Sequence, residues 1–147
     1  MEFEFRGSPL ASLNLLASYA FVQAQVTRST VFPVGNLLPN AARNSGALWA
    51  TYQAPPGPLR QWGFSAGLVA TSARQDNFYN TAQLPGYARL DFGSSYDLPL
   101  RERQAIRLSL NIQNALDRKY YQASNGTDQI RPGSPFSALA ALSWTWK

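Results

Sequence analysis

The chain has 147 residues, of which 45% are hydrophobic and only 14% are charged, well below the roughly 25% typical of soluble globular domains. It contains no run of about 18 apolar residues, which excludes a transmembrane helix, and no His or Cys, which removes the commonest general bases and soft metal ligands. Its 13 basic and 8 acidic residues give a net charge of +5, but Arg is scattered singly, so nucleic-acid binding is not expected.

Apolar and polar residues alternate with a period of two along the chain, which predicts strands. The expected strands are residues 2–6, 13–21, 44–53, 62–71, 89–98, 106–113 and 136–146. The facing of the third stays open, because Leu48, Trp49 and Tyr52 do not share one parity. A membrane barrel explains an apolar composition without apolar runs. We therefore predict an all-β fold, an antiparallel up-and-down meander of about seven to eight strands that forms a segment of a transmembrane β-barrel.

The predicted connections alternate between short turns and long loops, as the periplasmic turns and extracellular loops of outer-membrane barrels do. We expect the long-loop side to face outward, with a short strand around Tyr120–Ser124 in an extracellular hairpin. The short turns are Ser8–Ala11, Ala54–Pro58 and Pro99–Glu102, and the long loops are Thr27–Ala41, Ser72–Gly86 and Leu116–Pro135.

Strand number and polarity together predict a partial barrel. A first turn in the periplasm puts the start of the chain on the outer surface, whereas complete bacterial barrels have an even strand number and both ends in the periplasm. The opening residues MEFEFRG also lack the apolar region of a signal peptide. We expect earlier strands and the natural N-terminus to lie outside this sequence.

Aromatic residues are expected to mark the inner membrane interface, which amphipathic rings favour. The last strand, Phe136–Trp146, spans roughly 24 Å at 3.4 Å per residue and a 45° tilt, which matches the apolar band of such barrels. The rings near the predicted periplasmic ends are Tyr52, Trp62, Tyr96, Trp144 and Trp146. An ordinary sandwich core is the alternative explanation of the same periodicity.

Two segments of the chain carry distinctive motifs. Residues Leu84–Asp91 have the sequence LPGYARLD and are followed by Tyr96. They resemble the LPGY-x-x-x-D … Y strand of TonB-dependent siderophore receptors. Residues Leu110–Tyr121, LNIQNALDRKYY, resemble the family's L-N-V-x-N-L-F-D-K-x-Y-Y segment, which is the more specific of the two.

Two weaker matches stand in the correct order around them. Glu2–Gly7 with Leu13–Tyr19 is similar to the family's E-x-x-x-x-G … L-x-x-x-Y hairpin. The sequence PGSP at 132–135 is similar to its G-x-P-R element, although Phe136 stands where Arg is usual. Together the matches cover nearly the whole chain.

The resemblance implies that residues 1–147 are the C-terminal portion of a 22-stranded receptor barrel, with the plug domain and earlier strands absent. The intact protein would lie in the outer membrane of a Gram-negative bacterium, contact its lipid, bind a ferric siderophore and import it with energy transmitted by TonB through upstream segments. No cofactor and no resident metal are expected, and this portion alone is not expected to transport. The barrel assembly machinery would read the final aromatic alternation, although Lys147 follows it: Leu142, Trp144 and Trp146.

Candidate ligand contacts are Arg and aromatic residues in the outward loops, because ferric siderophore complexes are often anionic and partly aromatic. The alternative for each is stacking on a neighbouring loop or a place in the upper aromatic girdle. The candidates are Arg74, Phe78, Tyr79, Tyr120, Tyr121 and Arg131. A second group should point inward, toward the plug or into cross-strand pairs in the lumen: Arg89, Asp91, Asp97, Arg107 and Asn111.

Three other functions compete with the receptor. A small self-contained outer-membrane barrel with a structural or adhesive role would need an eighth strand and a signal peptide. An outer-membrane enzyme would need a nucleophile–base set, and we predict no catalytic residues. A soluble lipocalin-like binder would leave the outward apolar faces in water, a larger patch than monomers tolerate.

Overall fold

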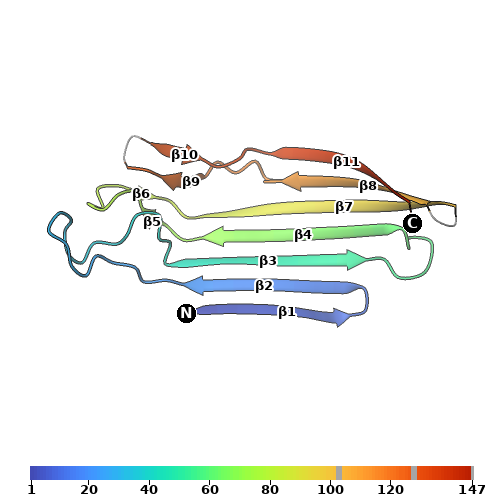
Figure 1. Ribbon diagram of the computed structural model, residues 1–147, viewed down its shortest axis with the longest axis horizontal. Coiled ribbons are helices and arrows are strands. Elements are labelled where there is room, and N and C mark those ends of the chain that lie inside the picture. The colour runs from blue at the N-terminus through green and yellow to red at the C-terminus, as the bar shows by residue number, and fades with distance from the viewer. Residues whose placement is uncertain (102–103, 127–128, 147) are drawn as a thin grey trace.

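The computed structural model describes residues 1–101, 104–126 and 129–146. The chain forms a seven-stranded antiparallel sheet in which each strand lies beside the next one along the chain, so the sheet is an up-and-down meander (Figure 1). This confirms the predicted fold class. The sheet order is β1 (Glu2–Leu10), β2 (Leu13–Phe21), β3 (Asn44–Gln53), β4 (Trp62–Thr71), β7 (Tyr87–Arg101), β8 (Gln104–Gln113) and β11 (Ser137–Trp146).

All three long loops leave the same end of the sheet, which we call the long-loop end, on the left of Figure 1. The first long loop is residues 22–43. The second, residues 72–86, contains a hairpin of β5 (Arg74–Gln75) and β6 (Gln83–Leu84). The third, residues 114–136, contains a hairpin of β9 (Tyr121–Ser124) and β10 (Ile130–Pro132), where the sequence predicted a short strand.

The turns at the opposite, short-turn end differ in extent from the prediction, and the middle connection runs over residues 54–61 and not only Ala54–Pro58. The chain turns at Ala11 and Ser12 and not over Ser8–Ala11, because β1 continues to Leu10. Its register shifts between Gly7 and Leu10, an irregularity that accommodates Pro9, which has no N–H for the ladder. β7 continues through Pro99 to Arg101, where the sequence predicted a turn over Pro99–Glu102, and Glu102 itself lies outside the described residues.

Register divides the sheet into two faces. Cross-strand partners share a face, and one face of every strand carries mostly apolar side chains. This apolar face includes Leu15, Leu48, Leu68, Leu90 and Leu108. The opposite, polar face includes Asn14, Thr51, Ser65, Arg89, Arg107 and Ser109.

The register settles the facing of β3. Leu48 and Tyr52 pair with Leu68 and Phe64 on the apolar face, whereas Trp49 lies on the polar face opposite Gly67. A Cβ atom at Gly67 would meet the Trp49 ring carbons at 2.6 Å, so the missing side chain leaves room for the indole. The mixed parity of β3 therefore reflects one large ring on the polar face.

Burial in this chain is inverted relative to a soluble domain. Large apolar side chains of the sheet are exposed, such as Leu108 at 46% and Trp144 at 61%. The side chains buried most completely belong to Asp76 and Asn114 at the long-loop end. An open apolar sheet surface of this extent is stable only against an apolar surrounding. Within the described part of the chain, no helix has the length and apolar character to cross a membrane.

Aromatic rings gather at the short-turn end, as predicted. Trp62 pairs with Tyr96 across the β4–β7 ladder, with ring centroids 5.1 Å apart, and stacks on Phe64 at 5.8 Å. Trp144 and Trp146 pair with Ile106 and Gln104 at the same end. These rings form an aromatic belt along the short-turn edge of the apolar face.

Candidate functional site

The three long loops form one assembly, in which polar side chains bridge from loop to loop. Asn40 of the first loop donates from Nδ2 to the Ser124 carbonyl at 2.7 Å and accepts from the Ser124 N–H at 2.8 Å. Asn80 of the second loop donates to the Leu37 carbonyl and accepts from its N–H, both at 2.9 Å. Each side-chain amide thus satisfies the hydrogen bonding of one backbone N–H and one backbone carbonyl in another loop, as a neighbouring strand would.

Both bridging asparagines have left-handed backbones, with φ of 59° at Asn40 and 54° at Asn80. Asparagine adopts this conformation more readily than other non-glycine residues. Each of these asparagines therefore forms both a local turn and a contact between two loops. Sequence analysis missed both, because an isolated Asn in a loop predicts a turn and gives no information on its distant partner.

Arg74 lies inside this loop assembly and is 5% exposed. Its Nη2 donates to the carbonyls of Tyr121 and Gln122, at 2.7 and 2.9 Å, and its Cζ lies 6.0 Å from the centroid of the Tyr87 ring. These contacts join the second loop to the third and to the start of β7. In this structure the guanidinium binds the protein's own backbone and does not face solvent.

The two segments that carry the family resemblance meet in one buried cluster, which we call the signature cluster. The rings of Tyr87 and Tyr120 pack together with centroids 4.2 Å apart and planes tilted by 33°, and the Tyr120 hydroxyl accepts from Arg89 Nη1 at 3.1 Å. Arg89 pairs with Asp91 at 2.8 Å, and Asp91 accepts from the backbone N–H of Asn114 at 2.8 Å. The motif residues thus hold the third loop against the sheet.

Asn114 also belongs to the signature cluster, and its side chain is completely buried. Its Nδ2 donates to the carbonyls of Arg118 and Ser134, at 2.9 and 3.0 Å, and its Oδ1 accepts from the Arg118 N–H. Asp117 accepts from the N–H of Phe136 at 2.8 Å, which ties the same turn to the entry of β11. Buried polar groups with this many partners specify one backbone path.

Gly133 lies against the Tyr120 ring, and a Cβ at this position would collide with ring carbons. We expect Gly133→Ala to lower the free energy of unfolding by about 1–3 kcal/mol, the usual effect of overpacking. Denaturant unfolding of the detergent-folded protein measures this.

The same Gly133→Ala change made in a Tyr120→Ala background should cost much less, because the new methyl group then has space. Equal losses in both backgrounds would show that the ring does not limit this position.

The structure divides the six predicted ligand residues into two groups. Arg74 and Tyr120 are buried, in the contacts given above. Phe78 and Tyr79 lie together at the tip of the second loop, 36% and 56% exposed. Tyr121 and Arg131 are exposed on the β9–β10 hairpin.

Sequence analysis missed Phe32 in the first loop. Its ring stacks on Phe78 with centroids 4.3 Å apart and meets Tyr79 edge-on at 5.8 Å. The sequence signal was the apolar run Val31–Val34 in a loop otherwise rich in polar residues. A loop has no strand periodicity to explain such a run.

Among the residues that the structure describes, two ion pairs lie on the polar face, which also carries the predicted inward residues. Asp97 and Arg107 are cross-strand partners joined by two bonds of 2.6 and 2.7 Å, as predicted. Arg89 instead pairs along its own strand with Asp91, because its cross-strand partner on β4 is Val69, and it also donates to Tyr120. Asn111 shares this face with Gly93, its partner on β7.

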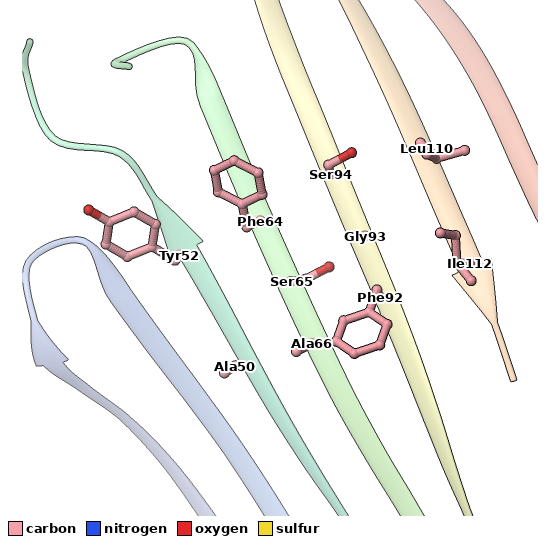
Figure 2. Close-up of a pocket in the computed structure, with 10 residues that line it drawn as sticks. All are labelled: Ala50, Tyr52, Phe64, Ser65, Ala66, Phe92, Gly93, Ser94, Leu110 and Ile112. Carbon is pink, nitrogen blue, oxygen red and sulfur yellow. The ribbon is translucent and has the colours of Figure 1, made fainter. Parts of the chain in front are cut away.

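A hollow of about 400 Å³ opens on the apolar face between β3, β4, β7 and β8 (Figure 2). Figure 2 shows the rings of Tyr52, Phe64 and Phe92 around the small side chains of Ala50 and Ala66. The apolar lining suits hydrocarbon and offers few groups that would orient a polar ligand. The hollow is therefore separate in place and chemistry from the loop assembly.

Comparisons with known proteins agree with this architecture. The family model described as TonB dependent receptor-like, beta-barrel matches residues 1–115. The metal-pseudopaline receptor CntO of Pseudomonas aeruginosa is 28% identical over 144 residues, which cover 96% of this chain and 20% of that protein. The ferrioxamine B receptor of Salmonella typhimurium is 25% identical over 135 residues, covering 92% and 19%. The chain thus spans about a fifth of the length of the curated relatives it matches.

Solved structures show the same fold. The siderophore receptor PiuA from Acinetobacter baumannii aligns with a TM-score of 0.79 and 26% identity, over 97% of this chain and 21% of that one. The ferric preacinetobactin receptor BauA from the same species aligns with a TM-score of 0.86 and 22% identity, over the same shares. In each case the seven-stranded sheet matches one part of a much longer chain.

Proposed function

This chain belongs to the TonB-dependent receptor β-barrel family, and from that premise we propose that it forms part of an outer-membrane receptor that binds ferric siderophores and imports them with energy from TonB. Residues 1–147 are then the C-terminal portion of the barrel. The plug domain and the segment that contacts TonB belong to other parts of the intact receptor. Residues 1–147 by themselves do not transport, and the role is uptake and not catalysis.

The observation that carries this proposal is the combination of an apolar sheet face with a polar, interlocked loop assembly at one end. The apolar face suits the lipid of the outer membrane, and the aromatic belt at the short-turn end suits its inner interface. The long-loop end then faces outward, where Phe78, Tyr79, Tyr121 and Arg131 are accessible to a ligand.

Membrane insertion involves a second partner. We propose that the barrel assembly machinery reads the end of β11, where Leu142, Trp144 and Trp146 alternate on the apolar face. Lys147, which follows them, lies outside the described residues. The wide exposure of these three side chains, between 61% and 74%, leaves them available to a partner before lipid covers them.

Uptake by a deletion strain tests the function directly. A strain that lacks the natural gene is grown with a chelator and a panel of ferric siderophores, each as the sole iron source. We expect growth on at least one siderophore to require the complete gene and a working TonB, while a plasmid encoding residues 1–147 restores nothing. Equal growth of deletion and parent strains on every siderophore that the parent uses would contradict the proposal.

The native product itself separates the receptor from a small self-contained barrel. An antibody against this segment is used on the outer-membrane fraction, and we expect a band several times heavier than 16.2 kDa. A heat-modifiable band at 16.2 kDa would instead favour a small structural or adhesive barrel.

A further inference from the structure

The tip of the β9–β10 hairpin, in the third long loop, begins with Asn125 followed by Gly126, a pair that occurs once in the sequence. Asn125 is exposed and Gly126 is half-buried. Gly126 has a left-handed backbone with φ of 91°, and a Cβ atom built on it would meet no atom within 4 Å. Because glycine itself has no Cβ, the backbone nitrogen of Gly126 is open to approach from the Asn125 side chain.

Hydrogen bonds hold the two groups next to each other. Asn125 donates to Gln129 twice, from its N–H to the carbonyl and from Nδ2 to Oε1, both at 3.0 Å. On the other side, the Ser124 hydroxyl donates to the Gly126 carbonyl at 2.7 Å. The Gly126 N–H itself donates to no backbone carbonyl of the described residues. Its nitrogen is therefore available as a nucleophile, and a group held beside its target reacts faster than one that must diffuse to it.

We propose that Asn125 is a modification site at which the side-chain amide is lost spontaneously. The Gly126 nitrogen bonds to Cγ of Asn125, the Cγ–Nδ2 bond breaks, and Nδ2 leaves as ammonia with the proton from the Gly126 nitrogen. Water then opens the resulting cyclic imide. Opening at Cγ gives aspartate, and opening at the backbone carbonyl gives isoaspartate. The reaction consumes one water and releases one ammonia, with no oxidation or reduction.

The products change the contact between the first and third long loops. Both add a negative charge to the hairpin, and isoaspartate also lengthens the backbone by a methylene group. The preceding residue, Ser124, pairs with Ile130 across the hairpin and is held by Asn40 of the first loop. A longer backbone beside Ser124 weakens these contacts, so the third loop loosens from the first as the protein ages. This inference does not depend on the proposed transport function.

The test uses the intact receptor in detergent, incubated in mildly alkaline buffer, which promotes loss of the amide proton. Samples are digested under mildly acidic conditions, and mass spectrometry quantifies asparagine, aspartate and isoaspartate at each position. The same protein unfolded in urea provides the reference without the hairpin. Asn125→Gln is the matched variant, because its longer side chain closes a larger and less favoured ring. Asn114, which is completely buried and precedes Ala115, is the internal control.

We expect Asn125 to convert in the folded receptor, whereas Asn114 stays intact until the protein is unfolded. The Asn125→Gln variant should lose all conversion at this position. Hydrogen exchange of the peptide that contains Ser124 should rise in the aged wild-type receptor and stay constant in the aged variant, because only the wild type gains the longer backbone.

Asn125 that stays intact in the folded receptor while it converts in urea overturns the proposal, because the hairpin then protects the amide. Conversion of Asn114 in the folded receptor at the same rate also overturns it, since the hairpin would then have no special reactivity. Conversion of Asn125 with no rise in hydrogen exchange overturns the loosening of the loops. Growth on siderophores is a separate measurement, so the proposed function stands or falls independently of these results.

Discussion

Asp91→Ala is expected to lower the free energy of unfolding by about 3 kcal/mol, toward the lower end for a broken buried ion pair, because Arg89 keeps some contact with water. The change leaves Arg89 without its carboxylate and leaves the backbone N–H of Asn114 without an acceptor. Tyr120 then contacts a guanidinium that has lost its anchor. The third loop should detach from the sheet while the strands remain paired.

Asp97→Ala is the matched control, because Asp97 lies on the same strand and face and also pairs with an arginine. The Asp97–Arg107 pair is largely exposed, and such pairs contribute at most about 1 kcal/mol. Urea unfolding of the lipid-reconstituted receptor gives both values. Similar losses for the two variants would show that the signature cluster gives no special stability.

Leu108→Arg is expected to destabilise the folded protein by about 2–4 kcal/mol in lipid, the cost of a basic side chain near the middle of a lipid-facing strand. Leu108 lies near the centre of β8 on the apolar face, paired with Tyr96 and Leu142. Unfolding from liposomes measures the loss. The effect is expected to come from the surrounding hydrocarbon, because the Leu108 side chain is exposed on the apolar face.

Ser109→Arg, one residue further along β8, controls for strand propensity and side-chain size. Ser109 lies on the polar face beside Ser95 and is expected to tolerate arginine within about 1 kcal/mol. If the two substitutions cost the same, the apolar face is not the lipid-facing side, and the proposed location of the protein in the membrane fails with it.

The sheet was predictable because the alternation of apolar and polar residues within each strand indicates on which face each side chain lies. In β8, Ile106, Leu108 and Leu110 alternate with Arg107 and Ser109, so period and face follow from a few neighbouring residues. Trp49 could not be assigned in this way. Its facing depends on the space above Gly67, a residue on another strand.

The loops were predictable in length and position but not in their contacts. Tyr120 and Tyr121 are adjacent and chemically alike, yet Tyr120 is 7% exposed and Tyr121 42%. The difference arises because Tyr120 packs against Tyr87 and Gly133, and neither of these residues is a close neighbour of Tyr120 in the sequence. Charge and ring type suggested ligand contact for Arg74 as well, but its partners are carbonyls of the third loop.

The bridging asparagines have a consequence for antibody recognition. Asn40 holds Ser124 in place, and Asn80 holds Leu37, so the surface of each long loop is shaped by residues of another. A synthetic peptide copied from one loop would lack these partners and would not keep the native shape. Antibodies raised against such peptides would recognise denatured protein on a blot and miss folded protein on cells. An immunogen that reproduces this surface has to display all three loops on their strands.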